Sequence, residues 1–287
     1  MRISTQTDAV FKHFGIDEGM KIFKEAGFDA VDFSMFYMNA REDCEFNHMS
    51  EDELVGKLLE ASAKYSLPFN QAHAPFPCYR FDDEQYNTFI YDKVSLAVRI
   101  AGKIGADQII VHPTACPDGV DQKQFNVDFY NSLKLLCEEF GTKIALENMF
   151  ARDRRRNVMV ANVCSYGEEL AEYYDALDPR YFTVCLDLGH CGLVGDDAPH
   201  AIRVLGHDRL TALHVHDNDY IDDYHMMPFT FDLDWTAIAQ ALHDINYSGD
   251  VTLEDDGFIN RLPKRALING VRVSADLAAE LRDMINL

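Results

Sequence analysis

The sequence predicts an α/β protein, a single (β/α)8 barrel that spans residues 1–287. Short apolar runs alternate with longer amphipathic segments along the whole chain, which is typical of consecutive strand–helix units. Eight such units share the 287 residues, at about 36 residues each, and eight units favour a closed barrel. No linker rich in Pro, Gly or Ser divides the chain, so we expect one domain.

The predicted strands are short runs of apolar, β-branched or aromatic residues. In chain order they comprise residues 2–5, 30–34, 69–72, 108–111, 143–146, 182–186, 210–215 and 250–253.

The predicted helices lie between these strands and carry apolar residues at helical spacing. The helix over residues 51–65 has on one face Leu54, Leu58 and Ala61. The helix over residues 121–140 has on one face Phe125, Phe129, Leu133 and Leu136. Turn residues separate helix from strand, for example at Gly105 and Gly141.

An open, doubly wound sheet is the alternative architecture. In nucleotide-binding proteins of that class a Gly-rich phosphate loop follows a strand. Neither G-x-G-x-x-G nor G-x-x-x-x-G-K-[ST] follows any predicted strand, so the closed barrel is favoured.

The composition excludes several classes of protein. With 47% hydrophobic and 11% aromatic residues, the chain has enough apolar side chains for a core and is not a disordered chain. Its 48 acidic and 26 basic residues give a net charge of −22. This charge disfavours nucleic acids and acidic membranes as partners, because both are bound through clustered Lys and Arg.

The N-terminus and the cysteines indicate the compartment. The first residues contain no apolar signal-peptide segment, and no run approaches the ~20 apolar residues that span a bilayer. The seven cysteines are scattered and form no C-x-x-C pair, as expected for free thiols in a reducing compartment. We therefore expect a soluble, cytoplasmic protein. The sequence allows a homo-oligomer but does not fix the oligomeric state.

Six predicted strands end next to a histidine or a carboxylate. These residues are His73, His112, Glu147, Asp187, His214 and Glu254, separated by 27 to 40 positions. In a barrel the carboxyl ends of the strands meet at one rim, where active sites form. Because such a cluster is costly to desolvate without a partner, the sequence predicts a divalent-metal site. A hydrogen-bonded structural role is the alternative for any single residue.

The ordered motifs H-x-P, H-P, L-E-N, L-D-x-x-H, H-x-x-D, D-x-H and L-E resemble those of the xylose isomerase-like barrels. These comprise sugar-phosphate isomerases and epimerases, with the endonuclease IV-type AP endonucleases as relatives. The resemblance covers nearly the whole chain and implies a metal-dependent isomerase or epimerase of a sugar, keto-sugar or sugar phosphate. By motif match it implies that a divalent ion is bound by Glu147, Asp187, His214 and Glu254.

Carboxylate and imidazole ligands suit Mn²⁺, Mg²⁺ or Co²⁺, and Zn²⁺ competes for them. The resemblance makes Mn²⁺ the first expectation. An ion that holds a sugar carbonyl and the adjacent hydroxyl stabilises an enediolate, so a proton can leave the neighbouring carbon. The resemblance assigns removal and return of this proton to Glu147 and Glu254 as the catalytic residues.

The other candidate residues are expected to bind the substrate. They are His73, His112, His190, His216, Asp223 and His225. His190 matches L-D-x-x-H, and Asp223 with His225 forms the D-x-H element. Hydrogen bonds within the barrel or its loops are the alternative role for the histidines.

Two further functions stay open. Every ligand type of the three-metal endonuclease site has a counterpart here, which keeps an AP endonuclease-like phosphodiesterase as one alternative. A catalytically silent sugar-binding barrel is the other.

Two segments depart from the family pattern. Where P-G-x-G-x-x-D-W is common, this chain has Phe229 and Phe231 at the Gly positions, which predicts a more apolar mouth or packing between loops. The basic run 152–156 follows Glu147 closely. On the active rim Arg154 and Arg156 would bind a phosphate or carboxylate of the substrate, whereas pairing with nearby acids is the alternative.

The aromatic residues after the second predicted strand, Phe36 and Tyr37, are expected to line the pocket or to pack within loops.

Overall fold

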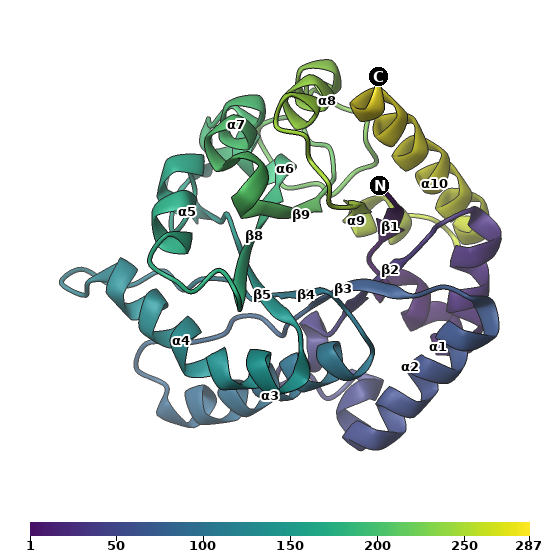
Figure 1. Ribbon diagram of the computed structural model, residues 1–287, viewed down its shortest axis with the longest axis horizontal. Coiled ribbons are helices and arrows are strands. Elements are labelled where there is room, and N and C mark those ends of the chain that lie inside the picture. The colour runs from purple at the N-terminus through teal and green to yellow at the C-terminus, as the bar shows by residue number, and fades with distance from the viewer.

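The computed structural model describes residues 1–287 and confirms the (β/α)8 barrel. Figure 1 looks along the barrel, with the strands around the centre and most helices in an outer ring. The barrel strands are β1 (Ile3–Thr5), β2 (Val31–Ser34), β3 (Phe69–His73), β4 (Gln108–Ile110), β5 (Lys143–Glu147), β8 (Phe182–Asp187), β9 (Leu210–His214) and β10 (Val251–Leu253).

All neighbouring strands of the barrel run parallel. Strands β2, β3, β4, β5, β8 and β9 pair in this order, and β1 pairs with β10. Single parallel bridges close the ring, from Gln6 to Asp32 on one side and from Val215 to Leu253 on the other. Because the strands are parallel, their carboxyl ends lie at one rim.

Ten α-helices accompany the strands. They are α1 (Asp8–Ala26), α2 (Glu51–Tyr65), α3 (Glu84–Lys103), α4 (Gln122–Phe140), α5 (Gly167–Tyr174), α6 (Leu188–Val194), α7 (Ala198–Arg209), α8 (Trp235–Asp244), α9 (Asp256–Ile259) and α10 (Lys264–Asn286). Two 3-10 turns, η1 (Phe36–Met38) and η2 (Glu45–His48), lie between β2 and α2. None of the helices is long and apolar enough to cross a membrane.

Helix α2 matches its predicted bounds and its predicted buried face. It begins where the Ser50 side chain accepts a hydrogen bond from the amide of Glu53, the hydroxyl half of a capping box. Three acidic residues in its first turn favour the same end of the helix dipole. The helix ends at Ser66, whose φ of 51° stops further helical hydrogen bonding.

The buried face of α4 differs from the predicted one. Of the four predicted residues only Leu133 is buried, and it shares the buried face with Asn126, Tyr130 and Cys137. The side chain of Asn126 bonds to both backbone groups of Thr114, and the Tyr130 hydroxyl donates to the carbonyl of Val111 at 2.8 Å. Polar side chains with backbone partners therefore occupy positions that a hydrophobic pattern assigns to apolar ones.

An antiparallel hairpin, β6 (Phe150–Asp153) with β7 (Val158–Ala161), follows β5 and was not predicted. The basic run 152–156 lies in this hairpin and its turn. Most of the core lies between the barrel and the helices. Inside the barrel lie a small apolar group, Ile110, Ala145, Cys185 and Ala212, and a buried polar group that includes Ser4, Asn70 and Thr252, linked by hydrogen bonds.

Candidate active site

The predicted residues at the strand ends converge. His73, Glu147, Asp187 and His214 are the last residues of β3, β5, β8 and β9, and Glu254 follows β10 directly. His112 lies two positions after β4. All six side chains are buried. The spacing of ionisable residues in the sequence thus corresponds to one rim of the barrel, as predicted.

A central cluster is formed by Glu147, Asp187, His214 and Glu254, whose ligand atoms all lie within 4.8 Å of one another. Nδ1 of His214 is 2.8 Å from Oε1 of Glu147 and 3.2 Å from Oε2 of Glu254. Three carboxylates and one imidazole form a donor set for a hard or borderline divalent ion. Burial of three carboxylates is costly without a cation, so these residues fit a metal ion.

Asp32, which sequence reasoning missed, lies on the far side of His214. Nε2 of His214 lies 3.5 Å from Oδ2 of Asp32, and the Gln71 amide donates to the same oxygen at 2.9 Å. Asp32 is fully buried on β2. A carboxylate behind a histidine favours the tautomer with the proton on that side, which leaves Nδ1 free for a metal.

The electrostatic surroundings separate the two glutamates. Burial disfavours the ionised form of Glu147, but His214 and His112 outweigh burial and lower its pKa well below the usual range. Nε2 of His112 lies 2.6 Å from Oε2 of Glu147. Burial raises the pKa of Glu254 to about 8, opposed by His214 and His225. Gln6, directly after β1, donates to Oε1 of Glu254 at 2.9 Å. The surroundings therefore favour the ionised form of Glu147 and the protonated form of Glu254.

A second cluster lies beside the central one and contains His190, His216, Asp223 and His225. Nε2 of His216 is 2.9 Å from Oδ1 of Asp187, so Asp187 joins the two clusters. Nε2 of His225 is 2.9 Å from Oδ2 of Asp223. The rings of His216 and His225 stack with centroids 4.1 Å apart. A Cβ on Gly189 would meet the His216 ring at 2.0 Å, so only glycine leaves room for this ring.

A third group, His73, His112 and Glu147, shares Glu147 with the central cluster. Burial, followed by the charge of His112, lowers the pKa of His73 to about 3. Asn148 of the L-E-N motif fixes the geometry between the groups, because its amide donates to the carbonyl of Asp187 and its oxygen accepts from the amide of Asp187. All the predicted histidine and carboxylate candidates therefore lie in three adjoining groups.

A cavity of about 420 Å³ adjoins the clusters, and six of their residues line it: His112, Glu147, His190, Asp223, His225 and Glu254. Phe36 and Tyr37 line it, as predicted, together with Phe76, Phe150 and Tyr224. Among the lining residues Arg261 is the single Lys or Arg, whereas Asp8 and Asp256 add two carboxylates to those of the clusters. Arg261, Asp8 and Asp256 were not predicted from the sequence. Asp8, like Gln6, comes just after the first strand, so the strand-end rule could have found both of these residues.

The structure does not bring Arg154 and Arg156 into this cavity. Both are exposed in the turn of the β6–β7 hairpin, where Nε of Arg156 contacts Oδ2 of Asp153 at 2.6 Å. Arg152 pairs with Asp222 at 2.8 Å. This arrangement agrees with the alternative of arginines paired with nearby acids, because the hairpin carries the run away from the cluster.

The two phenylalanines at the family's Gly positions do not line the cavity either. Phe229 packs against Trp235, and Phe231 stacks on Tyr224. Phe229 keeps a φ of 67°, the left-handed conformation that glycine adopts readily. Phenylalanine thus occupies a backbone conformation that glycine adopts more readily, and both rings pack against aromatic neighbours.

Comparison of the sequence with known families and proteins gives the following matches. A profile of the family described as "Xylose isomerase-like TIM barrel" matches residues 20–276. In sequence, the chain is 26% identical over 266 residues to an uncharacterized protein, y4fM, of Sinorhizobium fredii, covering 84% of this chain and 81% of that one. It is 32% identical over 95 residues to a D-psicose 3-epimerase of Enterocloster bolteae, covering 33% of this chain and 29% of that one.

Solved structures share the whole fold. A D-tagatose 3-epimerase-like protein superposes with a TM-score of 0.76 at 18% identity and covers 100% of this chain and 98% of its own. The IOLI protein with a bound zinc atom superposes with a TM-score of 0.74 at 14% identity and covers 100% of this chain and 98% of its own. At these identities the likeness is one of fold.

Proposed function

The chain belongs to the xylose isomerase-like TIM barrel family, and from this premise we propose that it is a divalent-metal-dependent epimerase or isomerase of a sugar. One observation carries the proposal: the ligand atoms of Glu147, Asp187, His214 and Glu254 meet within 4.8 Å, and the two glutamates line a cavity that aromatic rings also line. The epimerase names of a sequence relative and of a structural neighbour agree with it.

In this proposal the four residues of the central cluster hold the ion. Such an ion would supply Lewis-acid polarisation of a substrate carbonyl, which makes a neighbouring C–H bond more acidic. Glu147 and Glu254 would remove a proton from that carbon and return it through their carboxylate oxygens. Gln6 holds Glu254 through its Oε1, and His112 lies against Oε2 of Glu147, so both carboxylates keep fixed positions. Asp32 orients His214 from behind.

The charges of the cavity favour a sugar without a phosphate group. Phosphates are bound by arginines, lysines and backbone amides. The cavity has Arg261 alone against Asp8, Asp223, Asp256 and the two glutamates. Carboxylates accept hydrogen bonds from sugar hydroxyls, and aromatic rings pack on the C–H faces of a sugar. The substrate that matches this lining is an uncharged polyhydroxy carbonyl compound.

A second candidate function is supported by the three adjoining groups of potential ligands. Together they could hold three ions, as in an AP endonuclease-like phosphodiesterase. The net charge of −22 opposes binding of a polyanion. We therefore place this function second.

Metal analysis combined with hydrogen exchange tests the proposal. The purified protein is assayed for bound metals, and Mn²⁺-loaded protein is incubated in D₂O with a panel of neutral ketoses and aldoses. We expect a single bound divalent ion and deuterium at the carbon next to the carbonyl of at least one sugar, with no exchange after chelation. Three zinc ions without exchange would favour the phosphodiesterase, and a protein that binds no divalent ion would be a silent barrel.

A further inference from the structure

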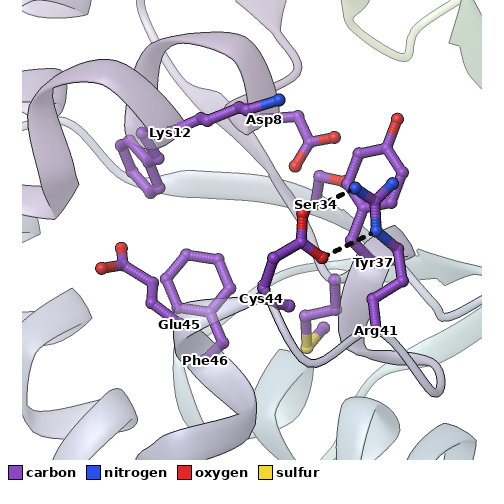
Figure 2. A pocket seen from close by; sticks show the side chains of 11 residues that line it. Asp8, Lys12, Ser34, Tyr37, Arg41, Cys44, Glu45 and Phe46 are labelled. Atoms are coloured by element: carbon purple, nitrogen blue, oxygen red, sulfur yellow. Dashed lines mark hydrogen bonds and ion pairs between the residues drawn. The ribbon is translucent and has the colours of Figure 1, made fainter.

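A second cavity, the side pocket, adjoins the main cavity beside the central cluster. It measures about 170 Å³ and lies between the start of α1 and the segment from β2 to η2. Asp8 and Tyr37 line both cavities. Figure 2 shows Asp8 and Lys12 on one side of the pocket, Phe46 and Glu45 opposite, and Tyr37 with Arg41 at one end. The side pocket and the main cavity therefore adjoin at Asp8 and Tyr37.

The side pocket combines an apolar wall with polar and charged side chains. Phe11, Met35 and Phe46 line it and are at most 8% exposed. The charged side chains of Lys12, Arg41, Asp43 and Glu45 are exposed around it. A dry apolar cavity of about 150 Å³ accepts benzene, so this pocket is large enough for one aromatic ring. An apolar interior with a few polar groups is the usual lining of a small-molecule site.

Asp8 marks the junction of the two cavities. No hydrogen bond contributes to its electrostatic balance, which is set by burial and by the charges of Asp256, Lys12, Arg41 and Asp32. No protein group donates a hydrogen bond to this carboxylate, and its oxygens are not among the buried, unpartnered polar atoms, so water can reach them. A hydroxyl of a sugar lying in the main cavity could take the place of that water. The end of the pocket at Tyr37 is fixed, because Arg41 stacks on the Tyr37 ring at 4.4 Å and pairs with Asp43.

We propose that the side pocket binds an apolar substituent of about the size of a phenyl ring on the sugar. This inference rests on the proposed function, and it names the substrate class as a glycoside with an apolar aglycone. The anomeric carbon of a glycoside is an acetal and has no carbonyl. The carbonyl that acidifies the reacting C–H bond is then a ketone elsewhere on the sugar ring.

Cysteine protection tests the proposal on the unmodified protein. Cys44 lines the side pocket and is half-buried. Cys116 is also half-buried, lies outside both cavities, and serves as the internal control; the other five cysteines are buried. Alkylation of both thiols by N-ethylmaleimide is followed by peptide mass spectrometry with Mn²⁺ and equal concentrations of the phenyl or the methyl glycoside of the same sugar, each with one ring hydroxyl oxidised to a ketone.

We expect the phenyl compound to slow alkylation of Cys44 and to leave Cys116 unchanged, while the methyl compound protects neither thiol. Burial of a phenyl ring should strengthen binding by about tenfold or more. Equal behaviour of the two compounds at Cys44 would overturn the proposal.

A filled pocket gives a second, independent measurement. Calorimetry should show that Cys44→Phe reduces the affinity for the phenyl compound to that for the methyl compound. Cys116→Phe, the matched control, should keep the difference. Equal affinities for the two compounds in the wild-type protein, or a full preference for the phenyl compound in Cys44→Phe, would contradict the inference.

These outcomes separate the inference from the proposed function. Protection of Cys44 by the phenyl compound needs no turnover, so it supports the subsite even if no sugar exchanges its hydrogen. Exchange of free sugars without any preference for the phenyl compound would leave the proposed function intact and overturn the subsite.

Discussion

Glu147 and Glu254 meet at one nitrogen of His214, yet their surroundings move their pKa values in opposite directions. Two carboxylates that differ in this way are suited to different halves of a proton exchange. The assignment of acid–base roles to them came from the family resemblance. The geometry supports it by showing that both reach the same small space.

Replacement of either glutamate by glutamine should remove turnover. Glutamine keeps the size and one oxygen for the ion but cannot accept a proton as a carboxylate does. General acid–base catalysis contributes about 10² to 10⁴ in rate, so we expect kcat to fall by at least that order at saturating Mn²⁺. Glu168→Gln is the matched control, because Glu168 contacts His200 at 2.7 Å on the surface.

Hydrogen exchange separates the two roles. A variant that removes the proton, and so incorporates deuterium, but forms no epimer has lost the group that returns the proton. Near-normal turnover of either variant at saturating metal would show that its glutamate is not the obligatory acid–base group.

Asp8 should make stability depend on pH. Burial, reinforced by Asp256, raises the pKa of Asp8 to about 7, whereas an unfolded aspartate titrates near ~3.9. The folded state therefore favours the protonated form. Its contribution to stability is full below about pH 4 and is lost as the pH rises through about 7. A shift of about three pKa units corresponds to about 4 kcal/mol, and solvent at this half-buried carboxylate reduces that figure. Asp8→Asn should therefore remove about 2 kcal/mol of the pH dependence between pH 4 and pH 8.

The measurement is urea unfolding of the metal-free protein at several pH values. Asp52→Asn is the control, because Asp52 is an exposed aspartate in the first turn of α2, as Asp8 is in the first turn of α1. A parallel pH profile for wild type and Asp8→Asn would contradict the prediction.

At the scale of elements, the sequence predicts best where local signals agree with the tertiary structure. Helix α2 has a serine cap, an acidic first turn and an apolar face that the barrel buries. In α4 the apolar pattern misleads, because Phe125 packs on Tyr79 and Phe81 from another loop while Asn126 and Tyr130 turn inward. Their hydrogen bonds to Thr114 and Val111 depend on residues that the local pattern does not contain.

The loop after β9 depends on one buried carboxylate. Asp217 accepts hydrogen bonds from the amides of Thr230, Phe231 and Leu233 and from the Trp235 indole. These bonds fix the segment that directly follows Phe229, which keeps its left-handed conformation. The family's glycines would adopt this shape without strain, so here the carboxylate compensates for the phenylalanine.

Asp217→Ala should therefore destabilise the protein by about 2 to 4 kcal/mol, because these four donors and the amide of Asn218 lose a charged acceptor. Asp219→Ala is the control: Asp219 caps the amides of Ile221 and Asp222 in a more exposed part of the same loop, and we expect a loss below about 1 kcal/mol. Denaturant unfolding gives both values. Equal losses would show that Asp217 does not organise the loop.

At the scale of the whole molecule, barrel closure explains why most of the candidate site could be predicted. Parallel strands with regular spacing place their last residues at one rim, so the convergence of Glu147, Asp187, His214 and Glu254 follows from position in the sequence. The choice of these four as metal ligands is what the family resemblance implies. Asp32 was missed because it lies within a strand rather than at its end. Arg261 was missed because its place depends on the path of a loop, and the hairpin carries Arg154 outward for the same reason.

The net charge of −22 gives the last prediction. The three ligand groups could serve a phosphodiesterase, but DNA must first approach an acidic protein whose cavity has a single arginine. Proteins that bind DNA without sequence preference do so at about 10⁻⁴ to 10⁻⁶ M through clustered cations.

We expect no saturable binding of an abasic-site duplex at such concentrations, and no cleavage above that of Glu147→Gln, which controls for contaminating nucleases. Repulsion between like charges weakens as salt rises, so low salt should not restore binding as it does for DNA-binding proteins. If the protein cleaves this DNA at physiological salt and Glu147→Gln abolishes the cleavage, the phosphodiesterase becomes the first candidate function. The protein would then bind DNA through groups other than a basic surface.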